Sequence, residues 1–273
     1  MLEASSNAAY AVQRGSLRLA FDLRRDRTVL ADRHASTPFG AVRAGYPDAS
    51  GMAEVQVTNP AGGVLGGDRL DITATLAPGS AATILTQGAT KVYKGEEARQ
   101  EALFDVGKSA LLEYLPHHLI PYAGSSYRQT TEFRLAEGAT LIAWDACSPG
   151  RVARGERFDF DNLSNRTKIF RCGMPQVMDG FELSGGGEPF GSYSYVGTLY
   201  LISASDLSPL AEKLHGTVNS LPGALASASV PSPNLCVMRT MTRNAPALYR
   251  MLNDCRATTR SFLDLPAPPR QVW

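Results

Sequence analysis

Leu70-Asp-Ile-Thr-Ala-Thr-Leu76, closed by Pro78-Gly79, is the stretch of sequence that decides the fold class. Its residues are alternately apolar and polar. An alternation of period two places the apolar side chains on one face of a strand and the polar ones on the other. Gly and Pro then punctuate the chain at short intervals through its first two thirds. We therefore expect a mainly β protein.

A similar strand-turn-strand pattern occurs three times. It covers residues 76–85, 104–112 and 135–142, with turn glycines Gly79, Gly107 and Gly138 that are 28 and 31 residues apart. Two interpretations stay open: stacked β units, or chance, because strand-turn-strand units are common in β proteins. Stacked units would place the strand ends near Lys91, residues 113–117 and Asp145 along one edge of a sheet.

Two helices are expected, both in the C-terminal half. Residues 206–216 combine capping residues with Pro209 in the first turn. Residues 244–264 carry an apolar stripe at helical spacing. The members of that stripe are Leu248, Met251, Leu252 and Cys255. The Gly-rich stretch 184–191 is a loop rather than a linker, so we expect a single domain over residues 1–273.

Composition excludes several classes of protein. The chain has 273 residues, 44% of them hydrophobic, and a formal charge of +1, which leaves no basic footprint for nucleic acid or an anionic membrane. The first residues show no signal-peptide pattern, and no run approaches the ~20 apolar residues of a membrane helix. The four cysteines (147, 172, 236, 255) never form Cys-x-x-Cys. We expect a reduced, cytoplasmic protein.

Asn59-Pro-Ala-Gly-Gly-Val-Leu-Gly-Gly-Asp68 is the most unusual segment. Clustered glycines are tolerated where the backbone turns tightly or passes close to something. A phosphate cradle is one interpretation, but no Gly-Lys-Ser/Thr follows and the dinucleotide spacing is missing. A pair of tight turns around Val64-Leu65, with Asp68 capping one of them, is favoured.

Two short polar stretches follow. Lys91 and Tyr93 share one face of a strand-like segment, whose simplest role is a solvated edge where lysine blocks unwanted pairing. His117-His118 come after Leu115-Pro116. Imidazole is a good nickel ligand, yet a polar turn after a strand is the favoured interpretation.

The segment from Trp144 to Arg157 concentrates Asp145, Arg151 and Glu156. A carboxylate beside an arginine is most often a structural ion pair. Asp145 and Glu156 could instead form an acid/base pair of a hydrolase. No nucleophile elbow accompanies them, and the four histidines lack a triad context.

Taken in order, these segments resemble the urease accessory protein D family (UreD, also called UreH). The pieces that carry the resemblance are Asn59–Asp68, Thr90–Tyr93, Leu112–Pro116, Leu141–Asp145, Gly150-Arg151, Gly155-Glu156, Leu163–Arg166 and the terminal Pro268–Trp273. Together they run from about residue 15 to the end of the chain.

The resemblance implies a helical β-structure and a scaffold that is not itself an enzyme. Such a scaffold binds the urease apoprotein and the accessory proteins F and G, the latter a nickel-carrying GTPase. It holds no tightly bound cofactor and passes Ni²⁺ on transiently. Asp68, Asp145 and Glu156 match the family's acidic positions. The alternatives are the hydrolase above and a β-scaffold for some other protein.

Two expectations follow for individual residues. Asp145 ends a very apolar strand, so its carboxylate needs a cation, a hydrogen-bond donor or water to offset its desolvation. A fixed partner such as Lys91 or Arg151 is one alternative, and a passing Ni²⁺ with ordered water is the other. The C-terminal segment mixes cationic and aromatic groups, a composition typical of interfaces. Its members are Arg256, Arg260, Pro268, Pro269, Arg270 and Trp273. Trp273 could equally pack the tail onto the core.

Overall fold

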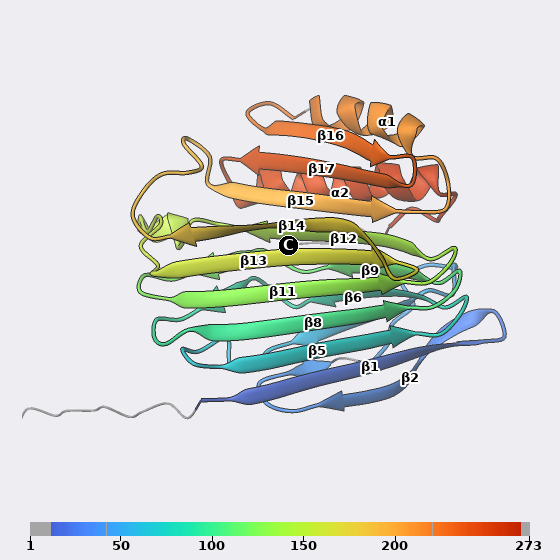
Figure 1. Ribbon diagram of the computed structural model, residues 1–273, viewed down its shortest axis with the longest axis horizontal. Coiled ribbons are helices and arrows are strands. Elements are labelled where there is room, and N and C mark those ends of the chain that lie inside the picture. The colour runs from blue at the N-terminus through green and yellow to red at the C-terminus, as the bar shows by residue number, and fades with distance from the viewer. Residues whose placement is uncertain (1–11, 42, 220, 269–273) are drawn as a thin grey trace, which may run out of the picture.

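The structure is a computed structural model that describes residues 12–41, 43–219 and 221–268 (Figure 1). Two β-sheets lie face to face in this part of the chain, and two helices pack on the outer face of the second sheet at one end. The protein is mainly β with both helices in its C-terminal half, as the sequence predicted. None of the helices in the described residues is long and apolar enough to cross a membrane.

Within the described residues, the strands follow a simple spatial order. The first sheet runs β14 (Met174–Ser184), β13 (Asn162–Arg171), β11 (Ser126–Leu135), β8 (Ala98–Val106), β5 (Arg69–Leu76), β1 (Arg14–Arg24), β2 (Arg27–Ala35). The second runs β16 (Leu225–Ser232), β17 (Leu235–Thr242), β15 (Tyr195–Ile202), β12 (Thr140–Cys147), β9 (Leu111–Leu115), β6 (Ala81–Thr86), β4 (Ala53–Thr58), β3 (Gly40–Ala41). The short strands β7 (Thr90–Val92) and β10 (Leu119–Pro121) join the second sheet from the side.

From β4 to β13 the chain winds as a helix of strands. Apart from the short strands β7 and β10, it alternates between the two sheets. The strands β5, β8, β11 and β13 of the first sheet and β4, β6, β9 and β12 of the second pair in parallel with one another in that order. The three similar stretches are therefore stacked units. Their alignment differs from the predicted one, because Leu76, Val106 and Leu135 are in register.

That register places Ser109, not Gly107, beside Gly79 and Gly138. All three residues have a positive φ, of 52°, 72° and 70° respectively, so they occupy one repeated turn position. Gly107 is a glycine for another reason. A Cβ on it would lie 2.6 Å from the carbonyl oxygen of Leu76, so the stacked turns approach too closely for a side chain.

The core fills the space between the sheets and a second space under the helices. In β5 the predicted apolar face is buried and the polar face is exposed. Phe104 and Phe133, on neighbouring strands, stack with ring centroids 5.0 Å apart. In β12, Leu141 and Ala143 point between the sheets, whereas Ile142 and Trp144 point to the helices.

Both predicted helices form, as α1 (Ser208–Asn219) and α2 (Ala245–Phe262). Asn244 caps α2, accepting a hydrogen bond of 2.9 Å from the amide of Ala247 on its side-chain oxygen. The predicted apolar stripe of α2 is buried.

The assignment of Arg256 and Arg260 to an interface was wrong, since each is only 1% exposed. Both bind Glu113 of β9 in the interior. Pro268 is half-buried, and the other predicted interface residues (Pro269, Arg270, Trp273) lie outside the described residues.

Candidate functional site

The Gly-rich segment forms the predicted pair of turns beside the open end of the two sheets. The amide of Gly62 donates to the carbonyl of Asn59 (2.9 Å), and the side chain of Asn59 donates to the carbonyl of Gly63 (2.8 Å). Asp68 is buried, and its carboxylate accepts from the amides of Leu65 (2.9 Å) and Gln13 (3.0 Å). Asp68 therefore caps a turn, as predicted.

Gly63 lies where the loop passes directly over β7. Val64 donates to the carbonyl of Lys91 (2.8 Å), and a Cβ on Gly63 would lie 2.4 Å from that same carbonyl oxygen. We expect Gly63→Ala to lower the free energy of unfolding by about 1–3 kcal/mol, because the backbone must shift to admit the methyl group. Urea unfolding measures the change. Gly88→Ala is the matched control, since nothing lies within 4 Å of its added Cβ. If both substitutions lowered the free energy of unfolding equally, the close approach of Gly63 to β7 would not be the cause.

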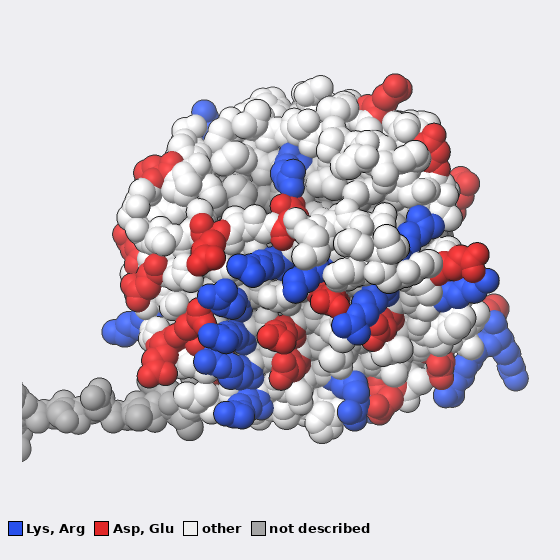
Figure 2. All heavy atoms as spheres, in the orientation of Figure 1, with Lys and Arg blue, Asp and Glu red and all other residues white. Residues whose placement is uncertain are grey.

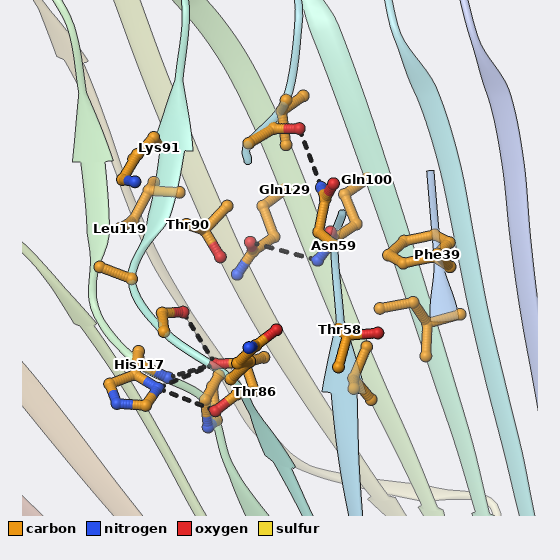
Figure 3. Close-up of a pocket in the computed structure, with 18 of the residues that line it drawn as sticks. Phe39, Thr58, Asn59, Thr86, Thr90, Lys91, Gln100, His117, Leu119 and Gln129 are labelled. Carbon is orange, nitrogen blue, oxygen red and sulfur yellow. Dashed lines mark hydrogen bonds between the residues drawn. The ribbon is translucent and has the colours of Figure 1, made fainter. Parts of the chain in front are cut away.

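Between this loop and the sheets lies a cavity of about 240 Å³ (Figure 3). Asn59 and Gly63 of the loop, Lys91 of β7 and His117 line it on one side. Polar side chains of the sheets (Gln100, Gln129, Asp145 and Asn165) also line it, together with apolar ones such as Val57, Ile72 and Leu119. Polar side chains between the sheets are thus gathered at this cavity.

Asp145 is the carboxylate at the inner end of this cavity. It follows the apolar run Leu141–Trp144, and its position on β12 directs it between the sheets. One carboxylate oxygen, Oδ2, accepts from Asn165 Nδ2 (3.3 Å) and from Thr167 Oγ1 (3.2 Å). Burial raises the pKa of Asp145 from an ordinary 3.8 to about 6, and these two hydrogen bonds act in the opposite direction.

Three amides form a ladder that ends on Asp145. Gln100 of β8, Gln129 of β11 and Asn165 of β13 are in register on adjacent parallel strands. Gln100 Nε2 donates to Gln129 Oε1 (3.4 Å), and Gln129 Nε2 donates to Asn165 Oδ1 (3.3 Å). Figure 3 shows the first two side by side, joined by a dashed line.

A second cavity, of about 580 Å³, begins on the other side of Asp145. Asp145 and Asn165 line both cavities. The second one lies between β14 and the strands β15, β16 and β17, where Asp179 accepts from Tyr200 (2.9 Å) and pairs with Arg239. Figure 2 shows that the surface over β15, β16 and β17 carries few charged groups, whereas the sheet surface below it is densely charged. The first cavity borders the glycine loop, the second borders β14 to β17, and Asp145 lies in the lining of both.

The other predicted site residues lie elsewhere. Glu156 and Arg151 form a two-pronged ion pair, with Arg151 also 4.3 Å above the ring of Tyr122. The hydrogen bond from Arg151 lowers the pKa of Glu156. Neither Asp68 nor Glu156 is among the described residues that line either cavity.

A fixed cation beside Asp145 was one of the two alternatives that the sequence left open. Arg151 forms its ion pair with Glu156. Lys91 lines the first cavity but makes no ion pair with Asp145 within the described residues. Asp145 is bound instead by the hydrogen-bond donors Asn165 and Thr167. In the described chain, no three His, Cys, Asp or Glu side chains are grouped to hold a metal ion.

His117 and His118 follow β9, as expected, but His118 is buried and His117 is half-buried. The amide of His117 donates to Thr86 Oγ1 (2.8 Å), and His118 Nδ1 lies 2.5 Å from the hydroxyl of Tyr249 on α2. Burial lowers the pKa of each ring to about 4, so both are neutral at pH 7. The pair anchors the turn between the first cavity and α2.

Comparisons with known proteins all give the same family. The family model described as "UreD urease accessory protein" matches residues 13–273. A "Urease accessory protein UreD" of Cupriavidus pinatubonensis is 32% identical over 271 residues, which cover 94% of this chain and 93% of that protein. Proteins of the same name from Herpetosiphon aurantiacus (37% over 196 residues, 68% of each chain) and Cenarchaeum symbiosum (30% over 260 residues, 89% and 90%) are similar too.

Proposed function

Because this chain belongs to the urease accessory protein UreD family, as its motifs predicted, we propose that it is a scaffold for nickel delivery to urease. It binds the urease apoprotein together with the accessory proteins F and G in the cytoplasm. It guides Ni²⁺ inward without holding a resident cofactor and without catalysing a reaction. The family membership supports the role in urease maturation, and the cavities support the passage of an ion.

The position of Asp145 is the observation that carries this proposal. It is a half-buried carboxylate that lines both cavities, and it has donors on one oxygen but no ion pair among the described residues. The neutral side chains of Asn165 and Thr167 contact it, and those of Gln129 and Gln100 follow along the ladder. Such oxygen ligands bind Ni²⁺ less tightly than imidazole or thiolate clusters do, so an ion that arrives can also leave.

The geometry does not favour the hydrolase alternative. Acid/base catalysis by two carboxylates requires that both face one substrate site. Glu156 is bound to Arg151 outside both cavities, so it does not face Asp145.

The test is Asp145→Asn, which keeps the shape of the side chain and removes its charge. We expect the variant to co-purify with apo-urease and with the F and G proteins, while nickel-dependent activation of urease falls about 10-fold or more. Asp71→Asn, on the exposed face of β5, is the matched control and should activate urease like the wild type. Full activation by a complex-forming Asp145→Asn variant would overturn the role of this carboxylate.

A further inference from the structure

Four arginines form a row on the outer face of the first sheet. They are Arg14 of β1, Arg69 of β5, Arg99 of β8 and Arg128 of β11, and the parallel register pairs each of them with the next. Each lies on the solvent-facing side of its strand, away from the core between the sheets. Figure 2 shows a column of basic groups over these four strands. We call this set the arginine row.

The arginine row is unfavourable for the sheet itself. Neighbouring strands lie ~4.8 Å apart, so the four positions span only about 14 Å. Like charges directly opposite each other on adjacent strands destabilise a sheet. In the described residues, Glu97 is the carboxylate that pairs with the row, binding Arg99 (2.6 Å) and Arg128 (3.3 Å). Ion pairs therefore neutralise only part of the positive charge of the row.

Local contacts hold several of the guanidinium groups in place. Nη1 of Arg69 donates to the carbonyl of Glu97 (2.6 Å) and to that of Asp68 (3.1 Å). The side chain of Glu97 fixes two further members of the row, as described above. Groups that are ordered before binding lose less conformational entropy when a partner arrives. A guanidinium group is also a planar fork that fits a carboxylate or a phosphate with two parallel hydrogen bonds.

Acidic side chains beside the row restrict the kind of anion that can lie on it. Asp71 of β5 and Glu101 of β8 are in register two residues further along their strands, about 7 Å from the row. Figure 2 shows a shorter column of acidic groups next to the basic column. A broad polyanion, such as nucleic acid or an anionic membrane, would cover both columns and be repelled by the second. The face therefore favours a narrow anionic partner that lies along the row.

The spacing of the row indicates the shape of this partner. Side chains at i, i+3 and i+4 on one face of an α-helix are about 5–6 Å apart, close to the ~4.8 Å between strands. An extended strand presents the side chains of one face about 6.7 Å apart, so it falls out of step with the arginines. A helix that lies across the strands can place one carboxylate near each arginine.

We infer that the arginine row binds an acidic α-helix of a partner protein, which carries Asp or Glu at successive turns of one face. This interaction goes beyond the proposed function and does not depend on the nickel role of Asp145. The arginine row faces solvent on the outside of the first sheet, whereas the cavity between the loop and the sheets lies on the inside.

The experiment measures the dissociation constant of a fluorescein-labelled peptide and the full chain by fluorescence anisotropy at low salt. The peptide is an alanine-rich helix of about 20 residues with glutamates at i, i+4, i+7 and i+11. We expect Arg99→Gln/Arg128→Gln to weaken binding about 5- to 10-fold, because two of the four carboxylates lose their partners. Arg18→Gln/Arg134→Gln is the matched control. It removes the same charge from exposed arginines of the same face that form ion pairs outside the row, and it should change binding less than about 2-fold.

A loss of affinity in the row variant alone supports the inference. An equal loss in the two double variants would show that net charge explains the binding, and a wild-type chain that does not bind the peptide would also overturn the inference. Single-stranded DNA of about 20 nucleotides is the competing probe. If it binds more tightly than the peptide and depends on the same arginines, the row is a phosphate-binding surface instead. Urea unfolding checks that the row variant is folded, and Arg14→Gln takes its place if it is not.

Discussion

Replacing Glu113 by Gln is expected to lower the free energy of unfolding by about 3–5 kcal/mol. Glu113 is fully buried on β9, and its carboxylate binds Arg256 and Arg260 of α2, each 1% exposed. The hydroxyl of Thr83 donates to it as well, at 2.9 Å. Glutamine would keep the volume of the side chain but leave buried guanidinium charge without its counter-charge.

Urea unfolding of the two proteins at pH 7 measures this difference. Glu137→Gln is the matched control, because Glu137 pairs with Lys108 where the two side chains are 75% and 65% exposed. Surface pairs of this kind contribute little to stability, because solvent screens both charges. An equally small loss in Glu113→Gln would show that water or another group replaces the buried carboxylate.

The same cluster explains how α2 is attached to the sheets. Arg260 also reaches Asp48 (2.9 Å), which precedes β4, so one helix is bound to two separate parts of the chain. Nε and Nη1 of Arg256 have no hydrogen-bond partner within the described residues. Glu113 is the carboxylate that forms an ion pair with Arg256 in the described chain, with Glu54 acting on it only at longer range, which is why the substitution is expected to be severe.

Local pattern was enough to predict most of the fold. The alternation in Leu70–Leu76 identifies a half-buried strand without knowledge of its neighbours, and the capping residue Asn244 marks the start of α2. The repeat was visible, but its register was not. A positive φ is typical of glycine, so Gly107 was matched to Gly79, whereas Ser109 takes that conformation in the structure.

Long-range pairing was not predictable in the same way. Arginine is rarely buried unless it is paired, and the partner of Arg256 is 143 residues away in the sequence. The spacing of Arg256 and Arg260 at i, i+4, beside the apolar stripe, was the available signal. Two arginines exposed on a helix have the same i, i+4 spacing, so this spacing does not predict burial unless the position of β9, which carries Glu113, is known.

The candidate site was predicted only in part. The apolar run before Asp145 indicated a carboxylate between the sheets, although β12 continues beyond it to Cys147 and the side chain is half-buried. Asp68 and Glu156 were grouped with it by family resemblance, although local hydrogen bonds and an ion pair hold them elsewhere. Gln100, Gln129 and Asn165 were missed, because only the parallel register of three strands makes neighbours of residues 29 and 36 positions apart.

Asp145→Asn is expected to stabilise the protein at neutral pH, which is the opposite of the effect at Glu113. The pKa of Asp145 is raised from 3.8 to about 6 in the folded chain, so its charge opposes folding. The destabilisation by the ionised carboxylate is fully present above about pH 6 and shrinks as the pH falls. It is gone below pH 3.8, where Asp145 is protonated in both the folded and the unfolded chain. A shift of this size corresponds to about 3 kcal/mol.

Unfolding of the wild type and of Asp145→Asn between pH 4 and pH 8 checks the sign. The free energy of unfolding of Asp145→Asn should exceed that of the wild type by about 2–3 kcal/mol at pH 8 and by close to zero at pH 4. The hydrogen bonds are kept, because an asparagine oxygen can still accept from Asn165 and Thr167. A loss of stability at pH 8 would reveal a cationic partner that the carboxylate neutralises. The same change of carboxylate to amide thus acts in opposite directions at the two sites. At Glu113 the charge holds the fold together, whereas at Asp145 it is retained at the expense of stability, which is the pattern of a functional group.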